Sequence, residues 1–350
     1  MKMPKVAVSN DKPSATIALT RPTQEHEHES LPKVVVCTET ATSTAILAPH
    51  AIALSNALGF KLELIHVIEP RAASQIPFDP IEWDLRRREA EAFVAKLSKQ
   101  YEAQKRNILT RVLQGRTSDQ ICACLVDNLE DIVALCRSDI ELPGHIGQTA
   151  RRVLENAANS VLMVPASADK DVIVNYQRIL VPLDGSARAE CALPLAKKVA
   201  QASNAKIILV HAIPEPVLTE IDPLNNEDVE LRDSLLRRNE RVAKDYIGRI
   251  QDNISADGLV ASSAILAGGD SRRLLNEAII NESADLLILS SHGCGGHADV
   301  AAGDVTSYLL ANASVPILMI RRPSQNGYGA NQHFYRSADS KGARRPTGAN

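Results

Sequence analysis

Aromatic residues are scarce in this chain, since Phe, Trp and Tyr together make up only 3% of its 350 residues. Its cores must therefore be built from Leu, Ile, Val and Ala, which suits a parallel sheet covered by helices. No apolar run approaches the roughly 20 residues that cross a bilayer, and the first residues contain no signal-peptide apolar region. We therefore expect no membrane contact and a cytosolic location.

An excess of charge of one sign is also lacking, because the net charge is only −3. No overall field then favours nucleic acid, and we expect no nucleic-acid partner. The six cysteines form no Cys-x-x-Cys pair and are interpreted mostly as small buried hydrophobes. His292, Cys294 and His297 offer three metal ligands in one short loop, but structural zinc sites draw ligands from two separated knuckles. We expect no metal site.

Catalytic patterns are missing as well. The chain contains no Walker-type Gly-Lys-Ser, and no Ser-His-Asp, Cys-His or carboxylate pair has a spacing that indicates hydrolysis. A binding protein is therefore favoured over an efficient enzyme.

What the chain does contain is one unit present twice. A shift of 145 positions places residues 33–70 on residues 178–215 without a gap, so that His66 falls on His211. Near the end of each half the shift becomes 156, and Gly147 then matches Gly303. Register at both ends of the unit indicates duplication.

Each half predicts the order strand, helix, strand, long helix, strand, helix, strand, helix, strand. The predicted strands of the second half are residues 178–183, 206–212, 261–266, 286–290 and 316–320. Short strands alternating with helices predict two repeated five-stranded parallel sheets of the doubly wound α/β class. Ligands of such sheets bind at the carboxyl ends of the strands, at the switch point.

The predicted domains are residues 31–166 and 176–322, joined by a linker at about 166–176. Residues 1–30 and 323–350 are rich in Pro, Ser, Gly, Asn and charge, and they carry no hydrophobic period. Such composition predicts two disordered tails.

The segment 284–322 holds the strongest candidate site. An apolar run, Leu286 to Leu289, ends at Ser290, and Gly293 and Gly303 follow before a predicted helix. A buried strand that feeds a glycine-containing loop and a helix start presents backbone N–H groups to an anion.

With these pieces placed, the chain resembles a tandem universal stress protein. The resemblance covers about residues 31–166 and 176–322, and the segments that carry it are residues 179–186, 209–212, 284–293, 303–306 and 315–318. It implies a flavodoxin-like, adenine nucleotide alpha-hydrolase-like fold that dimerises through its last strand. It therefore implies an internal pseudo-dimer that pairs residues 161–164 with residues 316–320, and homo-oligomers through the same strands.

The resemblance also implies a nucleotide site. ATP-binding members carry Gly, two residues, Gly, nine residues, Gly, then Ser or Thr, and these positions are Ser290, Gly293, Gly303 and Asp304 here. The remaining implied contacts are Asp184 for the ribose, Pro182, Ala212 and Leu289 for the adenine side, and Val305 and Thr306 for the phosphates.

Two of the four loop positions depart from the pattern. Ser290 is tolerable if its backbone is extended. A carboxylate at Asp304, about 4 Å from a phosphate oxygen, costs about 4 kcal/mol per charge pair at an effective dielectric near 20. A bridging Mg²⁺ would reverse that sign, and without it AMP or adenosine fits better than ATP. Asp184 has a second interpretation, as a cap for the following helix.

The first half departs further. Glu39 replaces the ribose acid, Asp139 replaces the middle glycine, and Gln148 follows Gly147. We expect this half to be a structural partner without a site. The leading hypothesis is a stress-response regulatory protein that binds ATP or AMP in its second half. The alternatives are an interaction module without nucleotide and a slow ATPase of the same fold.

Overall fold

A computed structural model describes residues 31–70, 80–137, 146–215, 226–293 and 302–321. Both predicted tails, and Asp139, Cys294 and His297, lie outside these residues. The strands are β1 (Lys33–Cys37), β2 (Lys61–Ile68), β3 (Leu109–Gln114), β4 (Ile132–Arg137), β5 (Ser160–Pro165), β6 (Arg178–Pro182), β7 (Lys206–Pro214), β8 (Ala261–Gly269), β9 (Leu286–Ser290) and β10 (Ile317–Ile320).

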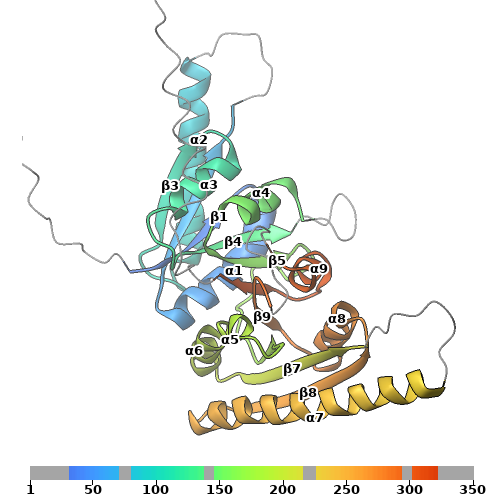
Figure 1. Cartoon of the computed structure of the whole chain (residues 1–350). Helices are drawn as coiled ribbons and strands as arrows, with labels where there is room; N and C mark the ends of the chain where they lie inside the picture. The colour runs from blue at the N-terminus through green and yellow to red at the C-terminus, as the bar shows by residue number, and fades with distance from the viewer. Residues whose placement is uncertain (1–30, 71–79, 138–145, 216–225, 294–301, 322–350) are drawn as a thin grey trace, which may run out of the picture. The chain divides into compact units, whose positions relative to one another are not determined.

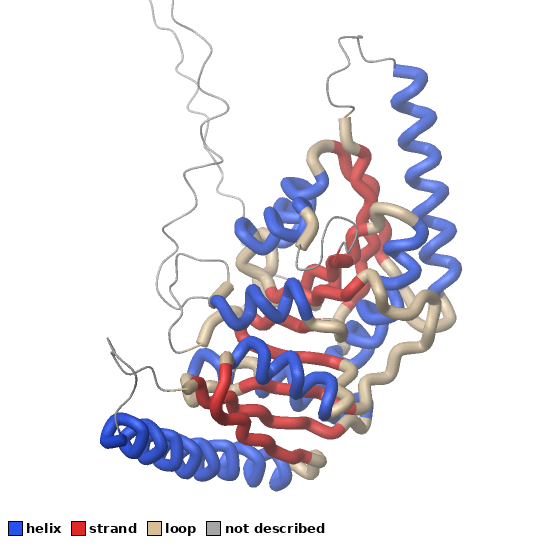
Figure 2. Tube along the Cα trace, turned by 90° about the vertical axis from the view of Figure 1, so that its right-hand side faces the viewer, coloured by secondary structure: helices blue, strands red, loops and turns tan. Residues whose placement is uncertain are grey.

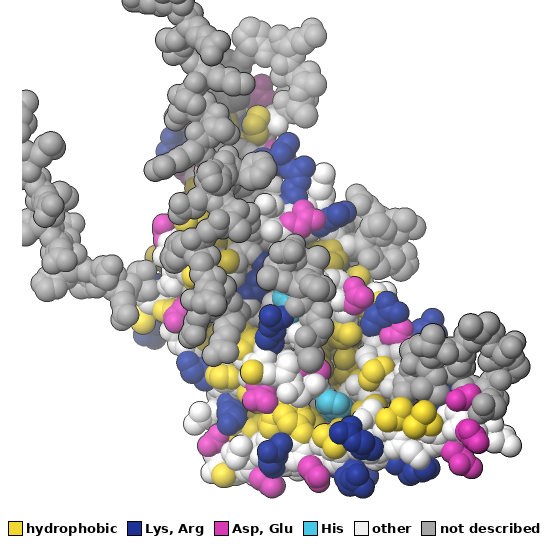
Figure 3. All heavy atoms as spheres, viewed as in Figure 1, with side chains coloured by type: hydrophobic (Ala, Val, Ile, Leu, Met, Phe, Trp, Pro, Cys, Tyr) yellow, Lys and Arg dark blue, Asp and Glu magenta, His cyan; other side chains and the backbone are white. Residues whose placement is uncertain are grey.

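The helices lie between the strands in the predicted order. They are α1 (Ala41–Leu58), α2 (Pro80–Tyr101), α3 (Thr117–Leu125), α4 (Gln148–Asn156), α5 (Ala187–Glu190), α6 (Leu193–Ser203), α7 (Asn226–Ala256), α8 (Ser271–Asn281) and α9 (Asp304–Asn312). None of these described helices combines the length and the apolar character needed to cross a membrane. On the face drawn in Figure 3, basic and acidic side chains are interspersed along α7, as on a solvated helix.

The strands form a single sheet in the order β3-β2-β1-β4-β5-β10-β9-β6-β7-β8. Within each half the order is the third strand, the second, the first, the fourth and the fifth, all parallel. Figure 1 shows β5 next to the elements of the second half, and Figure 2 shows the strands as one layer between helices. The predicted fold class, two doubly wound parallel sheets packed as a pseudo-dimer, is confirmed.

The duplication extends to hydrogen-bonding register. Val34 pairs with Leu62 in the first half, and Ile179 pairs with Ile207 in the second. Val34 and Ile179 are 145 positions apart, and so are Leu62 and Ile207, which is the shift that aligns the two halves of the sequence. The two halves therefore repeat the strand pairing as well as the order of elements.

Two apolar cores cover the two faces of the sheet. One core combines α1, α2, α6 and α7 with alternate strand residues, and it includes Val34 and Ile179. The other combines α3, α4, α8 and α9, and it includes Val35 and Leu180. Because successive strand residues point to opposite faces, the continuous apolar strands bury both sides, as a parallel sheet requires.

Both halves have a proline at the same aligned position, Pro49 and Pro194, and the two prolines affect their helices differently. Pro49 lies inside α1 and has no N–H to donate to Ala45 O, four residues earlier. The linker supplies the missing donor, because Asp171 N lies 2.9 Å from Ala45 O. In the second half Pro194 lies in the first turn of α6, where a missing N–H costs nothing. The single helix predicted there is accordingly split into α5 and α6.

The last strands of the halves pair antiparallel, with Leu318 opposite Leu162. The predicted pairing of these segments within the chain is confirmed. Strand β5 also pairs with β4, and β10 also pairs with β9, so both edges of each strand are occupied. Within one chain these strands thus have no unpaired edge, and the surface that a homo-oligomer would use stays a prediction.

Candidate functional site

The predicted site residues lie where β6 and β9 end. These strands are neighbours, with Leu180 opposite Leu287. After β6 the chain continues to β7 on one side of this strand pair, and after β9 it continues to β10 on the opposite side. This arrangement is the topological switch point at which doubly wound sheets form a crevice.

A tight turn follows β6 and holds Asp184 in place. Its Oδ1 accepts hydrogen bonds from Ser186 N at 3.0 Å and from Ser186 Oγ at 2.6 Å. Gly185 between them has φ +82°, a conformation that favours glycine. Ser186 then caps α5 by accepting a hydrogen bond from Ala189 N at 3.1 Å. Capping, one of the two interpretations of Asp184, therefore belongs to Ser186, and Asp184 orders the turn.

The loop after β9 closes directly against this turn. A Cβ atom on Gly293 would lie only 2.1 Å from Asp184 Oδ2, a separation that no side chain tolerates. Gly293 does not have positive φ, so a larger residue here would have to displace the Asp184 carboxylate and would meet no backbone restriction. The structure thus brings together the predicted ribose acid and the predicted middle glycine of the phosphate loop, which are 109 residues apart in the sequence.

Ser290 and Thr306 join the strand to the helix. Ser290 is the last residue of β9, so its backbone is extended, which is the condition under which serine can replace the glycine of the family pattern. Its Oγ donates to His292 O at 2.7 Å. Thr306 Oγ1 donates to Ser290 O at 3.0 Å in a buried position. Gly303 N donates to Ser291 O at 2.8 Å. These bonds fix where α9 begins relative to the end of β9.

The start of α9 is suited to an anion, with one opposing charge. Gly303 precedes the helix and has no side chain to cap its first N–H groups. Val305 is half-buried, and Asp304 is exposed in the first turn. Because Asp304 is exposed, its repulsion of a phosphate 4 Å away is nearer to about 1 kcal/mol per charge pair than to the 4 kcal/mol expected above.

Arg272 offsets Asp304, although the sequence indicated only an ordinary helix-surface charge. Its guanidinium lies 5.9 Å from the centre of the Tyr308 ring, one helical turn from Asp304 on α9. The pKa of Arg272 is raised, first by its hydrogen bond to Asp270 and also by the charge of Asp304. No spacing signal links positions 272 and 304, so only the packing of α8 on α9 shows this pair.

The residues predicted for the adenine side have the expected apolar character. Leu289 is buried, while Pro182 and Ala212 are half-buried at the ends of β6 and β7. His211 lies edge-on to Tyr246, with ring centres 6.2 Å apart. Burial lowers the pKa of His211, and a hydrogen bond with the Leu183 backbone opposes that shift. The structure confirms that His211 is packed, but its buried Nδ1 has no hydrogen-bond partner among the described residues.

In the described residues no group of three His, Cys, Asp or Glu side chains is placed to hold a metal ion.

A family model described as the universal stress protein family matches residues 31–165 and, a second time, residues 175–321. The two matches together span well over half of the chain.

The chain belongs to the universal stress protein family.

Two relatives in this family match a stretch about as long as one half of this chain. A universal stress protein of Thermus aquaticus is 30% identical over 147 residues, which are 42% of this chain and 99% of that protein. A universal stress protein of Methanocaldococcus jannaschii is 26% identical over 158 residues, 43% of this chain and 97% of that protein. Each relative thus corresponds to one copy of the repeated unit.

Solved structures of the family agree with the fold. The crystal structure of a universal stress protein from Archaeoglobus fulgidus covers 85% of this chain and 98% of its own, with a TM-score of 0.57 and 16% identity. Another universal stress protein from that organism was solved in complex with dAMP, and it covers 42% of this chain with a TM-score of 0.29 and 18% identity. At 16% identity the likeness to the first of these structures shows the fold alone.

Proposed function

We propose that the second half binds an adenine nucleotide at the crevice between β6 and β9, and that the protein acts as a binding or regulatory component of a stress response. The observation that carries this proposal is the contact of Gly293 with Asp184 at the switch point of the sheet. Asp184, which would accept hydrogen bonds from ribose hydroxyls, lies beside a loop and a helix start whose N–H groups would face phosphate. Membership of the universal stress protein family supports the same assignment.

The residues that would hold the nucleotide divide by its parts. Pro182, Ala212 and Leu289 would face the adenine, and Asp184 would accept hydrogen bonds from the ribose. The backbone around Gly293, Gly303, Val305 and Thr306 would hold the phosphates. If a triphosphate binds, Asp304 is the carboxylate placed to share a Mg²⁺ ion with it, because carboxylate and phosphate oxygens are the ligands Mg²⁺ prefers.

Thermal unfolding with AMP, adenosine, and ATP with and without Mg²⁺ tests the proposal. A ligand at a hundred times its Kd adds about 2.7 kcal/mol to stability, which is readily visible as a rise in Tm. Asp184→Asn should remove the rise, whereas Glu39→Gln, the matched change in the first half, should preserve it. No rise with any nucleotide would leave an interaction module. Nucleotide hydrolysis that disappears in Asp184→Asn would instead indicate a slow ATPase.

Asp304→Ser tests the charge in the phosphate loop. In EDTA the variant should bind ATP about fivefold more tightly, because removing one exposed carboxylate relieves about 1 kcal/mol of repulsion. Adenosine has no phosphate, so its affinity should not change. Isothermal titration of the wild type and the variant with both ligands provides the measurement. Equal or weaker ATP binding by the variant would contradict the assigned position of the phosphates.

A further inference from the structure

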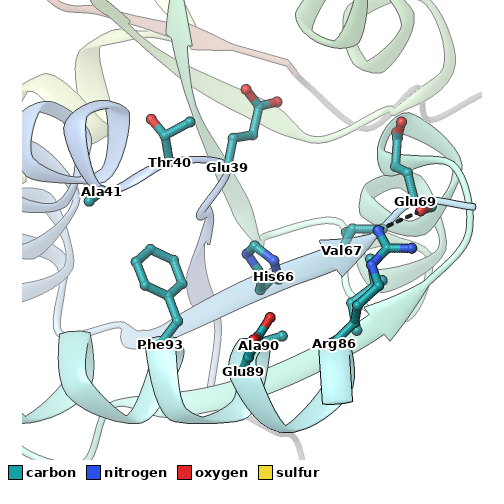
Figure 4. A pocket seen from close by; sticks show the side chains of 11 residues that line it. Glu39, Thr40, Ala41, His66, Val67, Glu69, Arg86, Glu89, Ala90 and Phe93 are labelled. Atoms are coloured by element: carbon teal, nitrogen blue, oxygen red, sulfur yellow. Dashed lines mark hydrogen bonds between the residues drawn. The ribbon is translucent and has the colours of Figure 1, made fainter. Parts of the chain in front are cut away.

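A pocket of about 370 Å³ opens in the first half (Figure 4). The carboxyl ends of β1 and β2 form one side of the pocket, and α2 forms the other. A volume of this size is typical of small-molecule sites. The nucleotide proposal concerns the second half and does not involve this pocket, although the sequence led us to expect no site here.

Carboxylates outnumber cations around the pocket. Among the described residues that line it, Glu39, Glu69 and Glu89 stand against one arginine, Arg86. The Arg86 guanidinium donates to the backbone oxygen of Glu69 at 3.2 Å. Glu69 Oε1 accepts a hydrogen bond from Thr117 N at 2.7 Å, which together with the Thr117 side chain lowers the pKa of Glu69. The charges of this pocket therefore repel phosphate.

Glu39 is the carboxylate without a structural task. Thr40 caps α1, since its side chain accepts from Ser43 N and the Ser43 side chain accepts from Thr40 N. At the matching place in the second half, Asp184 is held by Ser186. Among the described residues Glu39 makes no comparable hydrogen bond or ion pair. Glu39 is exposed, and its pKa is raised, first by partial desolvation and then by the charge of Glu69.

The pocket also has an apolar surface beside these carboxylates. Phe93 and Ala90 on α2 line it together with Val67 on β2. The Phe93 ring meets His66 edge to face, with ring centres 5.5 Å apart. Figure 4 shows His66 between Glu39, from the end of β1, and Phe93 and Glu89, from α2. An aromatic ring near carboxylates is a combination that attracts cations with apolar substituents.

We propose that this pocket binds a small organic cation, namely a protonated amine that carries an apolar group. The ammonium group would pair with Glu39, and Glu69 and Glu89 would add to the attraction. The apolar group would pack against Phe93, Ala90 and Val67. The two halves of the chain would then bind ligands of opposite charge, a nucleotide anion in the second and an amine in the first.

The test uses the full chain and benzylamine, which is charged at pH 7, with benzyl alcohol as the uncharged ligand of nearly the same shape. Calorimetric titration should show saturable benzylamine binding and at least tenfold weaker binding of benzyl alcohol, because the carboxylates recognise the charge. Glu39→Gln should weaken benzylamine binding by about tenfold. Asp184→Asn, the matched change in the second half, should leave it unchanged. Glu89→Gln, an exposed change on α2, provides a second variant should Glu39→Gln fail to fold.

Three results would overturn the proposal: no saturable benzylamine binding, equal affinity for the alcohol, or full affinity in both glutamine variants. Displacement of benzylamine by ATP would also overturn it, because the pocket would then accept anions. A pH series adds a further reading. Between pH 7 and pH 5 benzylamine stays charged, so its affinity should fall as Glu39 takes up a proton. Glu89→Gln should retain this dependence.

Discussion

Gly293 and Gly303, two glycines of the predicted phosphate loop, differ in the space that a side chain would have. At Gly293 the Asp184 carboxylate occupies the space that a Cβ atom would take. Gly303 has φ −67°, and a Cβ there would meet its nearest atom at 3.8 Å, an ordinary contact. Alanine therefore fits at position 303 and does not fit at position 293 unless Asp184 moves.

Gly293→Ala should accordingly lower AMP affinity by about tenfold, because the displaced Asp184 loses a charge-assisted hydrogen bond to the ribose. Gly303→Ala serves as the control and should retain both its stability and most of its affinity. Titration calorimetry with AMP measures the effect. Wild-type affinity in Gly293→Ala would show that Asp184 does not contact the ligand.

His50 gives the stability of the protein a dependence on pH. It is buried in α1, and its Nδ1 lies 3.1 Å from the hydroxyl of Tyr176 at the end of the linker. Burial lowers the pKa of His50 from 6.5 to about 4, and Asp169 only partly opposes the shift. Above pH 6.5 the neutral form is present in both states, so its contribution is complete. Between pH 6.5 and pH 4 the unfolded chain gains a proton that the folded chain does not.

The unfolding free energy should therefore fall by about 3 kcal/mol from this residue as the pH decreases from 6.5 to 4. Urea unfolding at a series of pH values measures the slope for the wild type and for His50→Gln, which retains a polar group beside Tyr176. The difference between the two slopes isolates His50 from the carboxylates. Parallel slopes would show that His50 is not the titrating group.

Among single residues, the sequence could predict those that belong to a pattern. The family resemblance pointed to Ser290, Gly293 and Thr306, which the structure brings together at the end of β9 and the start of α9, and their role in a site stays a prediction. Arg272 was not found, because its relation to Asp304 depends on how α8 packs against α9. The capping role went to Ser186 instead of Asp184 because the Gly185 turn moves the start of α5 two residues along.

At the scale of elements, the linker completes α1. Asp171 N satisfies the carbonyl that Pro49 leaves without a donor, and Asp171 Oδ1 accepts from Tyr101 Oη at 2.9 Å and from Gln100 at 3.1 Å. Asp171 has φ +51°, a left-handed conformation that Asn and Asp tolerate better than most residues. One linker residue thus joins α1 to α2.

Asp171→Ala should destabilise the protein by about 1–3 kcal/mol, because the hydroxyl of buried Tyr101 loses its acceptor. Asp171→Asn retains an acceptor oxygen and tolerates positive φ, so it should remain near wild type. Chemical denaturation of both variants distinguishes side-chain bonding from a general sensitivity of the linker. Equal losses in the two variants would favour the general sensitivity.

The elements themselves were largely predictable, since each strand is present twice and each copy supports the other. The pairing of the last strands was also predicted, from the family resemblance. The break between α5 and α6 was not predicted, because the same proline is accommodated within α1. The pocket of the first half was not predicted either. Comparison with a nucleotide-binding pattern shows that Glu39 replaces the ribose acid and does not show a different ligand.

At the scale of the whole molecule, two arginines hold the halves together. Arg137, at the end of β4, donates to Ala313 O at 2.7 Å and to Leu310 O at 3.4 Å, beside the end of α9. Arg321, after β10, donates to Ala157 O and Leu154 O, beside the end of α4. The two sets of acceptors are related by the 156-position shift. Each guanidinium also neutralises the negative end of a helix dipole.

Replacement of either arginine by Met should lower the unfolding free energy by about 2 kcal/mol, because buried carbonyls lose charge-assisted donors while the apolar stem is kept. Arg151→Met is the control, since Arg151 is 77% exposed in a surface pair with Glu155 and should change little. Denaturant titration of the three variants measures the differences. Losses of unfolding free energy as small as that of Arg151→Met would show that Arg137 and Arg321 do not stabilise the interface between the halves.

The pairing of β5 with β10 has a consequence for how the protein can change over time. Because one polypeptide carries both strands, each strand experiences the other at an effective local concentration of roughly millimolar, whatever the dilution of the protein. Even a contact of micromolar intrinsic strength would then be closed in about 99.9% of molecules. Tethering therefore permits residues along β5 and β10 to diverge further than they would in an assembly that must find its partner by diffusion.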